Sequence, residues 1–425
     1  MTLTPTADTV DRIATTVDVA AVQRRTLRLL FAIQVVSGVG VTVGSSVGAL
    51  LAADIAGVSA SGLAQSAAVV GSALLALPAA AIVHQRGRRP SLAAAYLVAA
   101  VGALIIVLAA VRESIPFMFA GFFLFGGATA AGMQARYAAV DLAPASSRGR
   151  HLSMIVWATT LGAVAGPHFA AFAGAAFADY GVPALAGPFV FSAVLFVLAA
   201  GSVGVLMRPD PAIIARHTVA PRSESESPRP DVGLRAALGT VVAAPPARVG
   251  VAAMAVGHMV MVGVMAMTPV HIRGAGHDAA HTLRIVGVVL SLHIAGMYAL
   301  SPVVGWLTDR VGRRPVIGAG IVLLVAACGL AGTAGYGTAR LAIGLMVLGS
   351  GWSCTIVAGS TLLSESVPAS LRPSAQGLSD AIMGLAGASA GALSGLIVDA
   401  WGYPMLALVA ALAATPFVLL MTQRR

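Results

Sequence analysis

Residues 248–315 decide the fold and read RVGVAAMAVGHMVMVGVMAMTPVHIRGAGHDAAHTLRIVGVVLSLHIAGMYALSPVVGWLTDRVGRRP. The apolar runs at 249–271 and 284–306 are each long enough to cross a bilayer, because a transmembrane helix needs about 20 mostly apolar residues. A short hairpin that contains histidines joins the two runs, and a basic turn follows the second. The stretch therefore predicts two successive membrane-spanning helices.

The rest of the chain repeats this pattern. Hydrophobic residues make up 58% of the 425 residues and charged residues 10%, and the mean hydropathy is +0.90. Inside a bilayer a helix satisfies all of its own backbone hydrogen bonds, so the expected fold is an all-α integral membrane protein with twelve transmembrane helices in two six-helix pseudo-repeats. The expected spans are 27–51, 60–83, 91–111, 115–136, 152–176, 187–207, 249–271, 284–306, 316–336, 340–363, 375–398 and 403–421.

Four regions follow from these spans. Residues 1–26 are expected to be a polar cytoplasmic tail, and 27–207 and 248–425 to be the two six-helix bundles. Between them, residues 208–247 are rich in proline, serine and charge, which is typical of a linker. A short amphipathic helix on the membrane surface is expected at 231–242.

Arginine placement predicts the orientation. All 26 basic residues are arginines, and with an even number of spans all but four lie on the side of the two termini. Because cytoplasmic segments carry the excess of positive charge, both termini and the linker are expected in the cytoplasm of a cell whose inner or plasma membrane holds the protein. The four arginines on the other side are Arg112, Arg273, Arg284 and Arg340.

Composition also limits the partners. The net charge of +10 comes from arginines that flank spans, so nucleic acid is not an expected partner. Cys328 and Cys354 both fall within spans, which excludes a disulfide framework or a CxxC metal site. The expected partners are the lipid bilayer and a small solute or metal ion, with no cofactor, and the chain is expected to be a monomer.

The two halves carry related motifs. RGRRP at 86–90 recurs within VGRRP at 311–315, and VDLAPASSRGR near Pro144 recurs as SESVPASLRPS near Pro368. Duplication at half-length is common among secondary transporters. The chain resembles the major facilitator superfamily, since GWLTDRVGRRP fits the superfamily motif between the second and third helices of a half. The matching residues are Gly305, Asp309, Arg310, Gly312, Arg313 and Arg314.

The resemblance implies a transporter rather than an enzyme, one that rocks its halves around a site near the middle of the membrane. It also implies a gate motif in which Asp309 pairs with cytoplasmic arginines. The first-half copy departs from the motif, with Ala80 in place of the first glycine and His84 in place of the aspartate. At these turns the alternative is simple positive-inside anchoring.

The fifth span contains LGAVAGPHFAAFAG, in which Gly162, Gly166 and Pro167 resemble a helix 5 motif of drug antiporters in the superfamily. Small residues at this spacing also allow close helix packing, and that explanation is sufficient by itself. Asp380 is the one carboxylate within an apolar span. It is a candidate for proton coupling, or else a residue stabilised at a helix N-terminus.

Methionine and histidine gather in spans 7 and 8. Met254, His258, Met261 and Met265 share one helical face, and His293 and Met297 lie one turn apart on the next helix. A rise of about 1.5 Å per residue places Met261 and His293 at a similar depth, roughly 20 Å from the cytoplasmic ends of their spans. Thioether and imidazole ligands suit copper, so this face predicts a copper site.

The two motifs, MxxxM at 261–265 and HxxxM at 293–297, resemble those of the CcoA-like copper importers, which belong to the same superfamily. That resemblance implies copper import. The alternatives are that the methionines only pack, and that the chain is a proton-coupled drug or metabolite transporter working in either direction. A sensor or scaffold that moves no solute is a further alternative.

Overall fold

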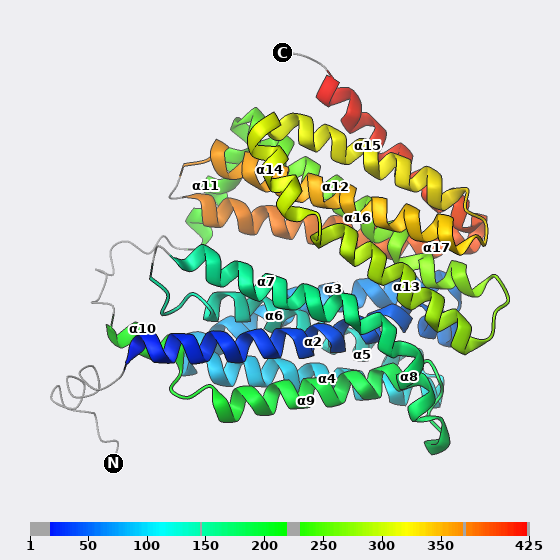
Figure 1. The fold of residues 1–425 in the computed structure, drawn as a ribbon, viewed down its shortest axis with the longest axis horizontal. Coiled ribbons are helices and arrows are strands. Elements are labelled where there is room, and N and C mark those ends of the chain that lie inside the picture. Colours follow the sequence, from blue (N-terminus) through cyan, green and yellow to red (C-terminus); the bar gives the residue numbers. More distant parts are fainter. Residues whose placement is uncertain (1–17, 145–146, 219–229, 369–370, 423–425) are drawn as a thin grey trace.

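The computed structural model describes residues 18–144, 147–218, 230–368 and 371–422, and all secondary structure in these residues is helical (Figure 1). In the first half the elements are α2 (Val19–Ala56), α3 (Val58–Arg86), α4 (Arg88–Arg112), α5 (Ile115–Phe125), α6 (Gly127–Ala138), α7 (Arg148–Ala165), η2 (Gly166–His168), α8 (Phe169–Ala176), η3 (Ala178–Tyr180) and α9 (Gly187–Leu206). The linker and second half contain α10 (Pro211–Thr218), α11 (Pro230–Ala243), α12 (Pro245–Arg273), α13 (Ala279–Tyr298), α14 (Ser301–Val311), α15 (Arg313–Gly332), α16 (Thr338–Ser366) and α17 (Arg372–Thr422).

The described residues form the twelve predicted spans. The described residues contain eleven stretches that are long and apolar enough to cross a membrane. The last of them, Ser374–Phe417, contains two helices, because Gly402 adopts a non-helical backbone with φ 80° and ψ 171°. Only glycine adopts such a backbone readily, so Gly402 turns the chain between the eleventh and twelfth spans.

Three spans are interrupted within their length. The fourth changes from α5 to α6 at Gly126, the fifth passes through the 3₁₀ turn η2, and the eighth breaks between Tyr298 and Ser301. The apolar runs predicted the spans but not these breaks, since hydropathy is continuous across them. At the start of the chain, α2 begins at Val19, eight residues before the expected span. Residues 1–17 of the expected tail lie outside the described residues.

The linker forms more helix than expected. The predicted helix at 231–242 corresponds to α11, whose Ala237 and Val241 are buried against the second half. The helix α10 was not predicted, and Arg216 within it donates a hydrogen bond from Nη1 to the His84 carbonyl at 2.8 Å. We call the end of the molecule that carries α10 and α11 the linker face, and the opposite end, with residues 274–278, the hairpin face.

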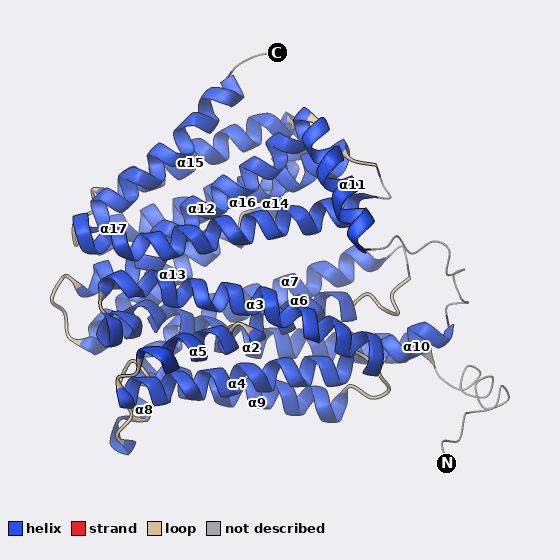
Figure 2. Ribbon diagram, turned by 180° about the vertical axis from the view of Figure 1, so that it is seen from behind, coloured by secondary structure: helices blue, strands red, loops and turns tan. Residues whose placement is uncertain are grey.

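The helices form two bundles that lie side by side, the first half from blue to green and the second from green to red (Figure 1). Seen from behind, α3 and α17 face each other across the boundary (Figure 2). The first bundle packs around Tyr96, Phe122 and Phe189, and the second around residues such as Met267 and Ile317, all of them almost fully buried. Each half therefore has its own core and can move as a unit.

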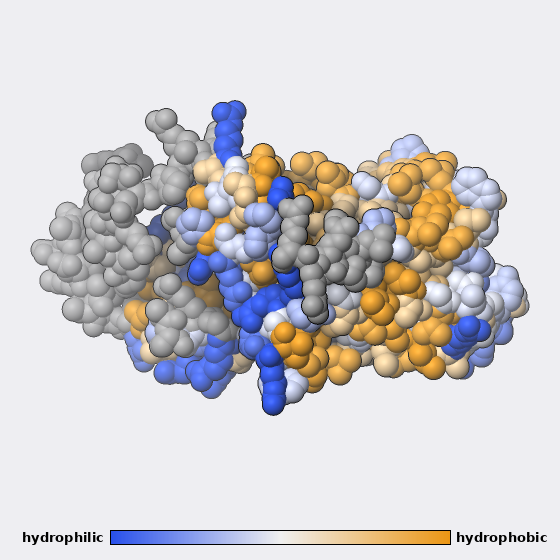
Figure 3. Space-filling model, turned by 90° about the horizontal axis from the view of Figure 1, so that it is seen from above, coloured by the Kyte–Doolittle hydropathy of each residue, from blue (hydrophilic) through white to orange (hydrophobic). Residues whose placement is uncertain are grey.

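The surface fits a protein embedded in lipid. Hydrophobic side chains cover a broad band of the face in Figure 3, whereas hydrophilic side chains gather towards its ends. Large apolar side chains within spans are exposed, among them Leu77 at 68% and Leu385 at 71%. Exposed apolar surface on this scale requires a hydrocarbon environment.

Candidate functional site

A cavity of about 270 Å³ lies between the halves. This volume is close to the lower limit of roughly 300 Å³ for small-molecule sites. Its lining combines aromatic rings with uncharged polar groups, which is the usual chemistry of an organic ligand site. The lining residues are Val41, Ser45, Gln65, Ala68, Val69, Ser72, Phe122, Phe125, Gly126, Thr129 and His258.

His258 is the contribution of the second half to this lining. Trp352 donates a hydrogen bond from Nε1 to His258 Nδ1 at 3.1 Å, so the neutral imidazole carries its proton on Nε2. The Trp352 ring in turn meets Tyr298 edge to face, with 5.8 Å between ring centroids. His258, Trp352 and Tyr298, which we call the aromatic wall, thus connect α12, α16 and α13 beside the cavity.

The predicted methionine and histidine face does not stay together. Met254 is buried beside Ser379 of α17, with Oγ and Sδ 3.8 Å apart, and His258 alone reaches the cavity. Met261 is buried in the core of the second half, and Met265 is half-buried against that core. Periodicity placed these residues on one face of α12, but α16 and α17 cover different parts of that face.

His293 and Met297 face α16. The His293 Nδ1 lies 2.8 Å from the Leu345 carbonyl, which can only accept, so Nδ1 carries the proton and Nε2 presents a lone pair. That Nε2 atom is buried and has no hydrogen-bond partner among the described residues. Met297 is buried against Gly349, where an added Cβ would lie 3.1 Å from Met297 Cγ.

Among the described residues no three His, Cys, Asp or Glu side chains gather as a metal site. A copper site would therefore depend on methionine sulfur. Cys354 does not complete it, because its Cβ packs towards Gly320 of α15.

The gate motif lies at the linker face, where Gly312 has φ 102° and joins α14 to α15. Arg313 makes its closest ion pair with Glu365 of α16, at 2.6 Å, whereas Asp309 lies 3.6 Å away and is 78% exposed. Arg310 lies over the Trp306 ring, 5.2 Å from its centroid. Arg314 is exposed, and an added Cβ at Gly305 would meet nothing within 4 Å.

The first half repeats this arrangement 225 residues earlier. Gly87 has φ 98°, and Arg88 binds Asp141 through Nε and Nη2 at 2.9 and 3.1 Å. Asp210 accepts hydrogen bonds from the backbone N–H groups of Arg88 and Arg89 at the start of α4. The arginine and carboxylate pair therefore recurs at the linker face even though His84 replaces the motif aspartate.

Asp141→Asn is expected to lower the free energy of unfolding by about 3 kcal/mol, because it leaves the Arg88 guanidinium without its counter-charge in a poorly hydrated place. The two side chains are only 13% and 16% exposed. The matched control is Glu365→Gln in the second half, where the pair is 26% and 50% exposed and water replaces the lost partner. Thermal unfolding of both variants in detergent checks this, and equal midpoints would contradict it.

The helix 5 motif packs the fifth span against the first. An added Cβ at Gly162 would fall on the Val35 carbonyl, and one at Gly166 on the Thr42 hydroxyl. Across the halves, the Pro167 carbonyl lies 3.0 Å from the position of a Cβ on Gly287 of α13. These contacts make close packing the observed role of the small residues.

The halves meet on the hairpin side. Three hydrogen bonds join them among the described residues, and all three lie towards the hairpin face: Ser66 to Ala388 at 2.6 Å, Ser291 to Val164 at 2.7 Å and Arg273 to Asp54 at 2.6 Å. An added Cβ at Gly62 would fall on the Gly391 carbonyl, so α3 and α17 touch through their backbones. The central cavity is thus closed towards the hairpin face.

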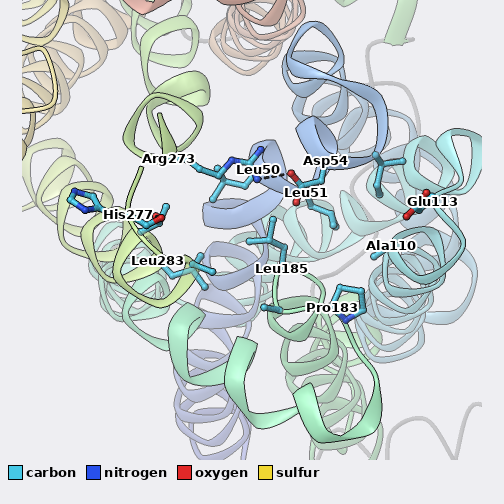
Figure 4. Close-up of a pocket in the computed structure, with 14 residues that line it drawn as sticks. Leu50, Leu51, Asp54, Ala110, Glu113, Pro183, Leu185, Arg273, His277 and Leu283 are labelled. Atoms are coloured by element: carbon cyan, nitrogen blue, oxygen red, sulfur yellow. Dashed lines mark hydrogen bonds and ion pairs between the residues drawn. The ribbon is translucent and has the colours of Figure 1, made fainter. Parts of the chain in front are cut away.

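Above this closure lies a second pocket, of about 430 Å³, lined by both halves (Figure 4). Arg273 and Asp54 point toward one another across it, and Glu113 and His277 lie at its edges. In the nearby hairpin, the N–H group of His281 donates to Asp278, which holds the pKa of that carboxyl below its usual value. His271 stacks between Tyr336 and Tyr403 instead of facing the pocket.

One charged residue near the cavity was missed by the sequence reasoning. Asp380 was singled out, and it is exposed on α17. Arg136 on α6 was counted only as one of the topological arginines. Asp380 of α17 and Tyr298 of α13 lie within electrostatic range of Arg136, without a direct contact. No signal in the sequence alone points to Arg136, because only the structure shows that Thr129, seven residues earlier on the same helical face, lines the cavity.

Comparisons with known proteins agree with this architecture. Two proteins of Bacillus subtilis, the uncharacterized MFS-type transporters YdeG and YddS, are 37% and 35% identical to this chain, each over 91% of it and over 88% and 87% of their own lengths. The riboflavin transporter RfnT of Brucella anthropi is 27% identical over 80% of this chain and 82% of RfnT.

Solved structures share the fold at low identity. The nucleoside transporter NupG superposes with a TM-score of 0.73 at 14% identity, covering 94% of this chain and 98% of NupG. A bacterial homologue of the lysosomal transporter Spinster, in an inward-facing and unoccupied conformation, gives 0.70 at 15% identity and covers 94% of each chain. The sequence pattern of the Major Facilitator Superfamily matches residues 29–283 and 277–424. The chain therefore belongs to the Major Facilitator Superfamily, a family of membrane transporters and not of enzymes.

Proposed function

We propose that this chain is a secondary transporter that carries an organic small molecule by alternating access. The observation that supports this most is the central cavity, which both halves line with polar and aromatic groups and which their contacts close on the hairpin side. The name of RfnT, a riboflavin transporter, favours a heteroaromatic solute. Rocking the two bundles would open the hairpin side and release or admit the solute there.

The proposal includes the orientation and the domain boundaries. With 22 arginines on its side, the linker face is assigned to the cytoplasm of a cell whose inner or plasma membrane holds the protein. The bundles are assigned to 27–207 and 248–425, joined by the linker 208–247. In intact cells, a tag at either terminus should be shielded from an impermeant reagent, and labelling without permeabilisation would overturn this orientation.

Asp380 is the proposed proton-coupling residue, because it is the one carboxylate within the apolar spans expected from the sequence. The helix 5 motif and the gate motif take the superfamily roles of close packing and conformational latching. Asp380→Asn with full uphill transport and unchanged pH dependence would remove the coupling role. A normal transport rate in Asp309→Asn would show that Asp309 is not needed for latching, and the Arg313–Glu365 ion pair would then be the candidate latch.

The experiment that tests the solute class measures flux into proteoliposomes of riboflavin, nicotinate and a panel of other heteroaromatic compounds. His258→Leu should lower uptake of the transported compound roughly tenfold. Without the imidazole, the Trp352 N–H loses the acceptor that fixes the aromatic wall beside the cavity, and an unsatisfied buried donor costs about 1–3 kcal/mol. Ser350→Ala on the same helix as Trp352 is the control, since its hydroxyl bonds only the Met346 carbonyl. If none of these compounds crossed the membrane, the result would count against an organic solute.

Copper import is the second candidate, and the bare Nε2 atom of His293 favours it. Histidines that bind metals typically donate their other ring N–H to a carbonyl, as His293 does to Leu345. Met261 and Met297 lie in the same buried core and would supply soft sulfur. In this case the chain would import Cu(I) along α12 and α13.

If copper is carried, His293→Ala and Met265→Leu should each lower cell-associated copper at equal expression. The leucine change keeps the side-chain volume, which costs a core typically under about 1.5 kcal/mol, and removes only the thioether. Met259→Leu is the control, because position 259 points roughly 160° away from Met261. Equal copper content in the parent and all three variants would exclude copper transport and mean that these methionines only pack.

A further inference from the structure

Arg136 lies on the cavity side of α6. Thr129, which lines the central cavity, precedes it by seven residues, and Gly132, which faces Gln34 of α2, precedes it by four. Spacings of four and seven return to the same face of a helix. Arg136 therefore shares the face of α6 that carries Thr129, and it lies two turns closer to the linker face.

The second half presents a carboxylate to the same region. On α17, Asp380, Gly387 and Gly391 form one stripe, because they are spaced seven and four residues apart. Gly387 packs against the His258 ring, and Gly391 against Ser66 of the first half. Leu385, on the other side of the helix, is 71% exposed. The stripe that carries Asp380 therefore faces the first half and the passage, not lipid.

Within the part of the chain that the structure describes, Arg136 has no direct counter-ion. None of the ion pairs among the described residues includes it, and its buried Nε atom has no hydrogen-bond partner. Asp380 and Tyr298 of the aromatic wall lie within electrostatic range of it, without touching it. A cation held in a passage without a partner is costly unless something of opposite charge comes to it.

Guanidinium chemistry indicates what that partner is. Its planar fork of N–H donors matches the two oxygens of a carboxylate or phosphate. His258 lines the same cavity as Thr129, and together with Trp352 and Tyr298 it offers ring faces and edges to an aromatic body. An anionic group and an aromatic ring in one molecule would satisfy both features at once.

We propose that Arg136 is the anion-binding residue of the central cavity and that the transported solute is an aromatic organic anion, a carboxylate or a phosphate ester. The inference rests on the proposed function and narrows its substrate class. Asp380 is the counter-charge that the solute replaces beside Arg136. An anion that enters from either side thus meets Arg136, which makes no ion pair with Asp380.

The test uses the full chain in lipid nanodiscs with paired probes: benzoate against benzamide, and benzyl phosphate against benzyl alcohol. At least one anion should raise the unfolding temperature, whereas its neutral counterpart should not, and the pair that responds distinguishes a carboxylate from a phosphate site. Arg136→Gln should weaken that anion at least tenfold, and Arg136→Lys should keep part of the binding. Arg340→Gln, which removes a charge at the hairpin face, should leave binding unchanged. Anion binding retained in Arg136→Gln, or no anion binding in the parent, would overturn the proposal.

Two further results separate this site from a mere latch between the halves. The double variant Arg136→Asp with Asp380→Arg exchanges the two charges. If the pair only latched the halves together, the exchange would restore it, so full solute flux in this variant would overturn the proposal. Loss of anion binding would support it. If the protein moved a neutral solute and Arg136→Gln did not change that flux, the anion site would be contradicted. The proposed transport function would still hold. Anion binding without flux of any solute would support the site and contradict transport.

Discussion

Gly62→Leu is expected to reduce solute flux strongly while leaving each bundle folded. A Cβ at this position falls on the backbone carbonyl of Gly391 in the other half, and a carbonyl cannot rotate away as a side chain does. Overpacking of this kind costs about 1–3 kcal/mol. Only the conformation with the hairpin side closed contains the contact, so its population should fall roughly 5-fold to 150-fold.

Flux of the solute that the parent protein moves, measured in proteoliposomes at equal incorporation, checks this. The control is Gly384→Leu on α17, where an added Cβ meets nothing within 4 Å. Spin labels on the two halves at the hairpin face should show a longer distance in Gly62→Leu than in the control. Parental flux and an unchanged distance would mean that α3 and α17 do not separate during transport.

The converse change, a disulfide across the same contact, is expected to abolish flux reversibly. A Cβ on Gly391 would lie 3.1 Å from Ser66 Oγ, so the Cβ atoms of two cysteines at these positions can reach the separation of about 3.5–4.5 Å that a disulfide needs. Ser66→Cys with Gly391→Cys, made in a chain whose Cys328 and Cys354 are alanine, should lose flux on oxidation and regain it with a thiol reductant.

Each single cysteine variant is the control for that experiment, since neither can form the bridge. Both should transport equally before and after oxidation. If the oxidised double variant kept its flux at full cross-linking, the hairpin-side closure would not open in the transport cycle.

The spans were predictable because a membrane helix must be apolar along some 20 residues, which is a signal that tertiary context does not override. The turns at Gly87 and Gly312 were predictable for a related reason, since the repeated GRRP sequence places a glycine where φ is positive. The breaks at Gly126 and after Tyr298 were not, because the apolar pattern runs through them unchanged.

The candidate site was only partly predictable. Periodicity places His258 and Met261 near one another on α12, but it cannot say that His258 bonds Trp352 and lines the cavity while Met261 is buried in the core of the second half. At the gate, the motif pointed to Asp309, whereas Glu365, 52 residues after Arg313 in the chain, makes the closer ion pair. The anion-binding role proposed for Arg136 could not be predicted from the sequence, because it depends on a helix of the other half. In each case the missing information was which helix lies opposite.

The most direct test of alternating access is the side from which a cysteine in the central cavity can be labelled. Thr129→Cys is suitable, because Thr129 lines the cavity and is exposed. With the Ser66 and Gly391 cysteines oxidised, an impermeant maleimide should label position 129 from the linker side only. After selective reduction of that bridge, labelling from the hairpin side should appear. Labelling from the hairpin side at equal rates in both states would contradict a passage that opens by separation of α3 and α17.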